Sequence, residues 1–114
     1  MPYISVKVTE DINPQAEKAI KEGLGKAIAI IPGKNESWLM LDIASNCKMY
    51  FKGDNSKPCA FAEVKLLGAG TKESYSNMTG ALCELFEKVL GIPKDRTYVK
   101  YEECTHWGWN GSNF

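Results

Sequence analysis

The chain has 114 residues, of which 44% are hydrophobic and 25% charged, and its 14 basic residues balance its 14 acidic ones. This is the composition of one soluble globular domain, and the absence of a basic block argues against nucleic-acid or membrane-surface binding. No apolar run is long enough to span a bilayer, and the first residues lack the pattern of a signal peptide. We therefore expect a cytoplasmic protein, with secretion by a route that needs no signal peptide as the alternative.

The first half of the chain predicts a strand, a helix and a second strand. A strand is expected over residues 3–8 and another over residues 38–43. Between them, Asn13 and Pro14 are suited to the N-cap and first position of a helix, and Gly33 to a left-handed residue just past its end. Apolar residues with helical spacing are Ala16, Ile20, Leu24, Ala27 and Ile31. This spacing predicts an amphipathic helix.

The second half predicts the same order of elements. Strands are expected over residues 60–67 and 97–101, and Gly91 is placed to end the helix between them. The helical spacing is carried by Met78, Leu82, Leu85 and Val89. Two glycines inside the first predicted helix, Gly23 and Gly25, cost helix stability and indicate a close approach to the sheet.

Sliding the chain against itself by about half its length shows an internal repeat. The matches are Val6-Lys7 on Val64-Lys65, Leu24 on Leu82, and Gly33 on Gly91. We therefore predict one α+β domain over residues 1–114, a pseudo-symmetric β-α-β-β-α-β arrangement with repeats of about 1–57 and 58–114.

Right-handed crossovers would place both predicted helices on one face of the sheet. The other face would stay uncovered, and we assign to it the apolar strand residues Ile4, Val6, Leu41, Val64, Leu66 and Val99. Such a face predicts an oligomer joined sheet face to sheet face. The C-terminal residues 105–114 are too apolar for a frayed tail and should pack on a partner element.

The four cysteines, Cys47, Cys59, Cys83 and Cys104, form no closely spaced pair. Zinc sites usually show paired ligands, and disulfides belong mainly to secreted chains. We expect free thiols that behave as small hydrophobic side chains, and no metal site. The only histidine, His106, is expected to be structural.

Several motifs together resemble one known family. They are Met1-Pro2, Pro32-Gly33-Lys34, Pro58-Cys59-Ala60, the segment 95–99 (Asp-Arg-Thr-Tyr-Val) and the segment 108–114 (Gly-Trp-Asn-Gly-Ser-Asn-Phe). In this order and spacing, the chain resembles the macrophage migration inhibitory factor family of the tautomerase superfamily over its whole length. The resemblance implies a β-α-β-β-α-β subunit and a homotrimer with pockets between subunits.

The resemblance also implies an activity, the keto–enol tautomerisation of small α-keto acids such as phenylpyruvate, with a dopachrome-like compound as a further substrate. It assigns the general base to Pro2, which becomes the N-terminus once Met1 is removed. The other implied substrate-binding residues are Lys34, Leu67, Trp38, Trp107 and Phe114, with Tyr98 and Lys100 from the neighbouring subunit. The best-known members have Asn in place of Lys100 and Val in place of Trp107.

The chemistry of the reaction fits these residue types. A base that removes a proton next to a carbonyl must be largely unprotonated near neutral pH. Burial and a nearby cation both lower the pKa of an amine; Lys34 and Lys100 can supply the cation. The apolar wall would come from Leu67, Tyr98, Trp107 and Phe114. This chemistry requires no metal and no organic cofactor.

Alternatives remain open for single residues and for the function. Lys34 can be a solvated lysine favoured by a helix dipole, Lys100 an exposed residue on a strand edge, and Trp109 a packing residue at a subunit interface. The alternative function is a cytokine-like ligand of a cell-surface receptor in which the pocket is secondary. The Cys-x-x-Cys of the vertebrate cytokines is incomplete here, because Cys59 is not followed by a second thiol.

A third hypothesis is a related reaction such as dehalogenation or decarboxylation. Superfamily branches with those activities generally carry extra pocket arginines or acids. Arg96 is the only arginine of this chain, which favours the tautomerase.

Overall fold

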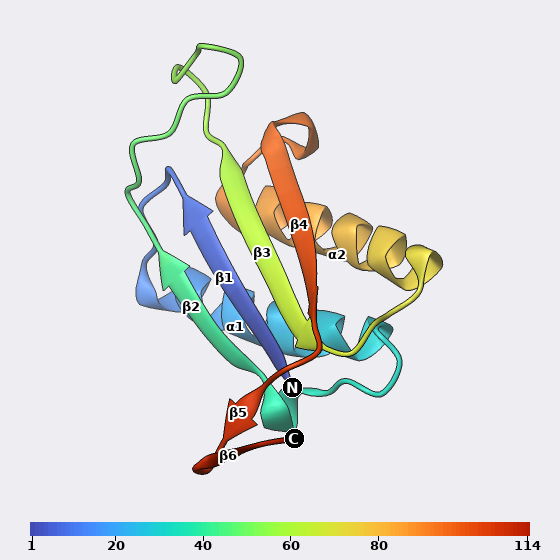
Figure 1. The fold of residues 1–114 in the computed structure, drawn as a ribbon. Helices are drawn as coiled ribbons and strands as arrows, with labels where there is room; N and C mark the ends of the chain where they lie inside the picture. The colour runs from blue at the N-terminus through green and yellow to red at the C-terminus, as the bar shows by residue number, and fades with distance from the viewer.

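A four-stranded sheet in the order β2-β1-β3-β4 forms the centre of the computed structural model, which describes residues 1–114 (Figure 1). Its strands are β1 (Pro2–Val8), β2 (Met40–Ala44), β3 (Ala60–Leu67) and β4 (Thr97–Cys104). The two helices are α1 (Pro14–Ala27) and α2 (Lys72–Leu90). A small hairpin of β5 (Gly108–Trp109) and β6 (Ser112–Asn113) ends the chain.

The two halves of the chain build the sheet in the same way. Strand β1 pairs parallel with β2, and β3 pairs parallel with β4, while β1 and β3 meet antiparallel at the centre. The register repeats as well: Tyr3 lies opposite Met40 in the first half, as Phe61 lies opposite Tyr98 in the second. The predicted β-α-β-β-α-β fold is therefore confirmed.

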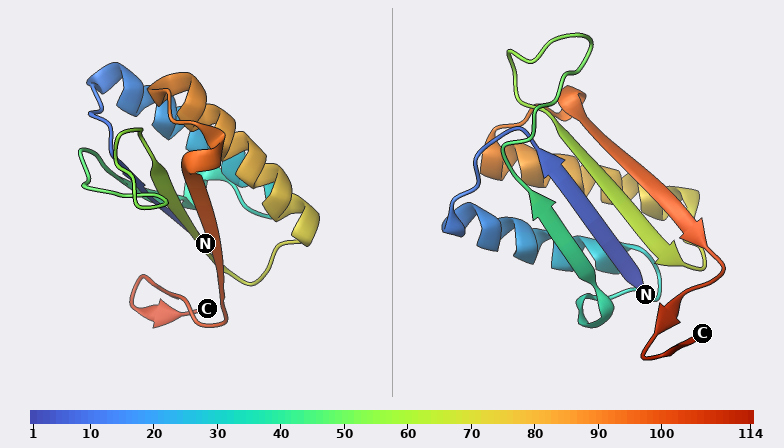
Figure 2. Two further views of the ribbon diagram at one scale, coloured as in Figure 1. Left: turned by 90° about the horizontal axis from the view of Figure 1, so that it is seen from above. Right: turned by 60° about the vertical axis from the view of Figure 1, so that its left-hand side comes forward.

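Both helices cover the same face of the sheet, as the view along the strands shows (Figure 2). The apolar strand residues face these helices: Ile4, Val6, Val64 and Leu66 are fully buried in the core, and Leu41 and Val99 pack against it. The prediction that this set lies on the uncovered face is wrong. Side chains alternate between the two faces of a strand, and the helices already bury the apolar set.

The open face of the sheet is mixed rather than apolar. The alternation places on it Tyr3, Ser5, Asp42, Phe61, Glu63, Lys65, Tyr98 and Lys100. Ion pairs join Lys65 to Glu63 at 3.5 Å and Lys100 to Glu102 at 3.6 Å. Met40 and Tyr98 of this face are exposed hydrophobic side chains, so an oligomer joined through this face stays a prediction.

Helix α1 starts as predicted but ends early. The Asn13 side chain caps the amide of Ala16, and Pro14 occupies the first turn. The helix then tightens into a 3₁₀ turn over Ile28–Ile30, so the left-handed Gly33 (φ 79°) lies in the following turn rather than at the helix end.

The two glycines of α1 do not approach the sheet. A Cβ atom on Gly23 would lie 2.5 Å from the side chain of Leu85 in α2, and one on Gly25 would lie 2.0 Å from the side chain of Glu36. The predicted contact with the sheet is wrong, because Gly23 lies against the other helix and Gly25 against the 3₁₀ turn that contains Glu36.

Helix α2 has strong signals at both ends. Thr71 and Ser74 form a reciprocal capping box, and Gly91 adopts the left-handed conformation (φ 68°) at the C-cap as predicted. Two predicted strand limits are wrong by two residues or more. The Asn35 side chain caps a 3₁₀ turn at Glu36–Trp38, so β2 begins later, and β4 runs on to Cys104.

The long connection between the halves is held by one arginine. Arg96 is 8% exposed and donates hydrogen bonds to backbone carbonyls of that connection, at Asp54 and Lys57 (2.9 and 3.0 Å) and at Pro58 (3.0 Å). Its guanidinium also lies over the Phe51 ring at 5.4 Å. The only arginine of the chain therefore anchors a loop.

The four cysteines are free thiols, with Cys59 and Cys83 buried and Cys47 and Cys104 half-buried. Burial raises the pKa of the Cys83 thiol. Neither helix of the structure combines the length and the apolar character needed to cross a membrane.

Candidate active site at the start of the first strand

A cavity of about 750 Å³ opens at the N-terminal end of β1. It lies between the first residues of β1, the segment from Ser37 to Asp42 and the segment from Trp107 to Trp109. Most of its lining is hydrophobic, which is typical of a small-molecule site. Figure 1 shows why these segments meet: the chain start, the beginning of β2 and the β5–β6 hairpin lie at the same end of the sheet.

The backbone at the chain start is held by Leu67. The Leu67 amide donates to the Met1 carbonyl at 3.1 Å, and the Leu67 carbonyl accepts a 2.7 Å hydrogen bond from the Lys34 ammonium. Burial, and then the positive charge of Lys34, lower the pKa of the Met1 amino group below its ordinary value. The structure thus brings the chain start, Lys34 and Leu67 together.

Aromatic side chains form one wall of the site. The rings of Trp38 and Trp109 meet edge to face with centroids 5.1 Å apart, and Trp109 stacks on Phe114 at 6.1 Å. The Phe114 amide donates to the Trp107 carbonyl at 3.0 Å. Trp38, Trp107 and Phe114 therefore gather near Pro2. Trp109, expected at a subunit interface, lines the cavity in this chain.

A polar group in the cavity lining was missed by the sequence analysis. Asp42 accepts hydrogen bonds from the hydroxyls of Tyr3 and Ser5, the latter at 2.8 Å. These bonds, from Tyr3 first, hold the pKa of the Asp42 carboxyl below its usual range, and the bond to Asp42 raises the pKa of Tyr3. The sequence alone offered no signal for this group, because the pairing of Ser5 with Asp42 depends on the register of β1 and β2.

Tyr98 and Lys100 lie elsewhere in the chain. Pro2 is opposite Leu66, whereas Tyr98 is opposite Phe61, so Tyr98 lies about 17 Å further along the sheet at the usual rise per residue. The Tyr98 ring packs edge to face on Phe51 at 5.2 Å. One chain does not bring Tyr98 or Lys100 to Pro2.

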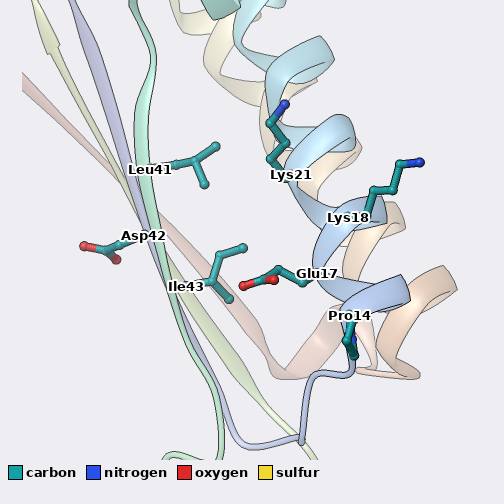
Figure 3. A pocket seen from close by; sticks show the side chains of 7 residues that line it. All are labelled: Pro14, Glu17, Lys18, Lys21, Leu41, Asp42 and Ile43. Atoms are coloured by element: carbon teal, nitrogen blue, oxygen red, sulfur yellow. The ribbon is translucent and has the colours of Figure 1, made fainter.

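A second cavity of about 500 Å³ lies between α1 and the edge strand β2 (Figure 3). Leu41 and Ile43 point toward α1, whereas Asp42 points to the other side of the strand. Lys18 and Lys21 of α1 line the opposite wall. None of the predicted site residues lies in this groove.

Comparison with known proteins agrees with this fold, which is that of the tautomerase-fold class. A family model described as macrophage migration inhibitory factor (MIF) matches residues 1–114. The chain therefore belongs to the macrophage migration inhibitory factor family.

Relatives of known sequence or structure match nearly the whole chain. Macrophage migration inhibitory factor of Xenopus laevis is 28% identical, over 100% of this chain and 99% of its own. The crystal structure of Leishmania major MIF2 superposes with a TM-score of 0.91 at 28% identity, covering 100% of this chain and 97% of that one. The homologue from Prochlorococcus marinus has a TM-score of 0.87 at 32% identity and covers 98% of both chains.

Proposed function

We propose that the protein is a cofactor-independent keto–enol tautomerase of small α-keto acids of the phenylpyruvate type, with Pro2 as general base. The observation that carries the proposal is the chain start in its cleft. There an amino group has a lowered pKa beside Lys34, and a largely hydrophobic cavity opens next to it.

The base is formed when Met1 is removed. The Pro2 nitrogen then becomes a secondary amine in the setting that lowers the pKa of the Met1 amine, so a useful fraction is neutral at physiological pH. In this form it takes a proton from the carbon next to the substrate carbonyl. The proton returns to oxygen or carbon, which completes the keto–enol conversion without any redox step.

Lys34 is the group proposed to bind the substrate carboxylate. Its ammonium uses one hydrogen bond on the Leu67 carbonyl and has three donors in all, so donors remain for an anion. The same positive charge disfavours the protonated form of Pro2. Trp38 and Trp107 would contact the apolar part of the substrate, for which an aryl ring is well suited.

The active assembly is proposed to be a homotrimer in which the neighbouring subunit supplies Tyr98 and Lys100. Two different exposed aromatic groups support this arrangement: Trp38, Trp109 and Phe114 at one end of the sheet, and Tyr50 and Tyr98 at the other. Contact between two unlike patches is head-to-tail, and head-to-tail contacts form a ring when the rotation between subunits closes. The pocket would then be completed at each junction of the ring.

The proposal is tested by extending the chain with one residue before Pro2. A blocked Pro2 nitrogen becomes an amide without basic character, so phenylpyruvate turnover should fall by roughly 10²–10⁴-fold, the usual contribution of a general base. The dopachrome-type reaction should fall in parallel. Turnover is followed spectroscopically on protein whose N-terminus has been verified by mass spectrometry.

The matched control is Pro2→Gly, which keeps a free amine at the same position and should retain part of the rate. Light scattering should show the same assembly and circular dichroism the same fold for all three proteins, so that a difference in rate reports on the amine. Full activity in the extended protein would mean that another group is the base.

A further inference from the structure

We propose that Arg96 is a positioning residue for the pocket of the neighbouring subunit: it holds Phe51 against Tyr98, and Phe51 fixes the Tyr98 ring in the orientation that receives substrate. This inference rests on the proposed tautomerase function and its shared pocket. Arg96 and Phe51 touch no substrate themselves and act through Tyr98.

The Tyr98 ring lies on an open surface beside two aromatic neighbours. It is 58% exposed, and exposed side chains change rotamer on the picosecond-to-nanosecond timescale. The Phe51 ring meets the Tyr98 ring edge to face with centroids 5.2 Å apart, and the Phe61 ring does so at 6.4 Å. Phe61 belongs to β3, opposite Tyr98, whereas Phe51 belongs to the long connection between β2 and β3.

Phe51 begins a tight turn in that connection. Phe51 and Asp54 exchange two backbone hydrogen bonds, of 2.9 and 3.0 Å. The two residues between them, Lys52 and Gly53, both have positive φ angles, of 54° and 75°, which is the pattern of a type I′ hairpin turn. Such a turn fixes its own backbone, but its place against the sheet depends on contacts from outside the turn.

Arg96 supplies those contacts. Its guanidinium donates to three backbone carbonyls within residues 54–58, at 3.0, 2.9 and 3.0 Å, and lies 5.4 Å from the centre of the Phe51 ring. Figure 1 shows the connection and the start of β4 at the same end of the sheet. Arg96 stands just before β4, in which Tyr98 is the second residue. One short segment therefore carries both the tyrosine ring and the group that holds the neighbour of that ring.

A Tyr98 ring that is already in place lowers the cost of substrate binding. Ordering one mobile side chain on binding weakens affinity by about threefold to tenfold. In the proposed trimer this ring contacts the substrate, whereas Pro2 of the next subunit moves the proton. Loss of Phe51 or of Arg96 should therefore raise KM and leave kcat nearly unchanged.

The first experiment measures phenylpyruvate turnover by the full chain with a verified Pro2 N-terminus. Phe51→Leu keeps an apolar side chain but removes the ring edge, so KM should rise by about threefold to tenfold at nearly constant kcat. Lys52→Gly is the matched control. It removes the other cation near the Phe51 ring, at 5.6 Å, keeps a residue suited to positive φ, and should have the KM of wild type. An unchanged KM in Phe51→Leu would overturn the inference.

A second experiment tests whether Phe51 acts through Tyr98. Tyr98→Ala should lower kcat/KM by itself, and adding Phe51→Leu to it should lower kcat/KM no further, because two changes that remove one contact are not additive. Independent structural damage would instead multiply the two losses. A double variant with multiplied losses would therefore show that Phe51 does not act through Tyr98.

Arg96 is tested by chemical rescue. Arg96→Ala should raise KM as Phe51→Leu does, and millimolar guanidinium should lower KM again, because this planar cation can donate to the same carbonyls. The same concentration of sodium chloride should have no such effect, and Arg96→Lys should recover little, since an ammonium lacks the planar fork. Rescue by sodium chloride as well would contradict the role of the Arg96 hydrogen bonds. Circular dichroism shows whether Arg96→Ala is folded, and Phe51→Leu remains informative if it is not.

Fluorine NMR separates this inference from the proposed function because it needs no turnover. The protein is labelled with 3-fluorotyrosine, and the Tyr98 signal is the one that Tyr98→Phe removes. In Phe51→Leu and Arg96→Ala this signal should narrow and move toward that of free fluorotyrosine. Such a change in a protein that turns over no keto acid would support the hold of Arg96 and Phe51 on Tyr98 and overturn the tautomerase. Normal turnover, with the same Tyr98 signal and KM in every variant, would overturn the positioning role alone.

Discussion

The two edge strands of the sheet occupy equivalent places in the repeat, but their open-face residues differ in charge and surroundings. In β2 these residues are Met40 and Asp42, and in β4 they are Tyr98 and Lys100. Asp42 lies in the cavity beside the chain start, whereas Lys100 is paired with Glu102 at 3.6 Å outside it. The two repeats therefore share the register of their strands but carry different side chains at equivalent positions.

The chain also continues differently after each edge strand. After β2 it enters the loop that Arg96 holds through backbone carbonyls. After β4 it turns back as the β5–β6 hairpin, whose Trp109 lines the cavity. One half thus builds an anchored loop and the other a wall of the cleft, which shows how a symmetric fold supports one asymmetric site.

The largest expected effect is the recovery of activity when two inactive variants, one altered in each half of the chain, assemble in the same oligomer. One variant carries an extra residue before Pro2, and the other carries Tyr98→Ala together with Lys100→Ala. Each should be nearly inactive alone. In a randomly mixed three-membered ring, some junctions join an intact Pro2 to an intact Tyr98, so a 1:1 mixture should recover about a quarter of the wild-type rate.

The measurement is phenylpyruvate turnover after the two proteins are unfolded and refolded together. The control mixes the same proteins after separate refolding, which should restore little activity if subunits exchange slowly. Rescue absent from co-refolded rings, with light scattering showing three chain masses, would place Tyr98 and Lys100 outside the pocket.

The next effect concerns the loop after β2, which Arg96 holds from the second half of the chain. Arg96→Ala leaves several loop carbonyls without their donor in a nearly buried position, so the free energy of unfolding should fall by about 2–4 kcal/mol. Urea unfolding measures this change. Lys94→Ala, at an exposed position on the same turn, should change stability by less than about 0.5 kcal/mol. Equal effects of the two changes would contradict the anchoring role of Arg96.

Sequence patterns predicted where the helices and strands lie better than which side of the sheet the helices cover. The spacing of Leu82 and Val89 and the position of Gly91 located α2 because helical period and capping are local properties. The assignment of Ile4 and Val64 to the open face failed, since alternation separates two faces without showing which one the helices cover. That choice depends on tertiary packing.

The candidate site was predictable only in part. Pro2 and Lys34 came from the family resemblance, and the structure places both residues at the same end of the sheet. Asp42 was missed because its place in the site depends on two hydrogen bonds from β1. These bonds exist only once the two strands are in register. Long-range register is not encoded in any short stretch of sequence.

A smaller effect is expected from replacing Lys100 by the Asn that the best-known members of the family have at this position. Lys100→Asn removes a positive charge from the proposed neighbouring-subunit wall, so KM for a keto acid should rise severalfold and that for its methyl ester should hardly change. Loss of a cation raises the pKa of a nearby amine, so the acid limb of the pH–rate profile should move to higher pH. Steady-state kinetics between pH 5 and pH 9 tests both effects. An unchanged ester preference and profile would place Lys100 outside the pocket.

The smallest effect compares the two helices through their internal glycines. Gly80 in α2 has open space where a Cβ would lie, whereas a Cβ on Gly23 in α1 would lie 2.5 Å from Leu85. Gly80→Ala should therefore stabilise the protein by up to about 1 kcal/mol, the difference in helix propensity. Gly23→Ala gains the same propensity but must displace Leu85 at the helix–helix contact, so it should be less stable than Gly80→Ala. Thermal unfolding of the two variants beside wild type measures the difference, and equal stabilisation would mean that Leu85 moves aside freely and that the close helix contact sets no constraint.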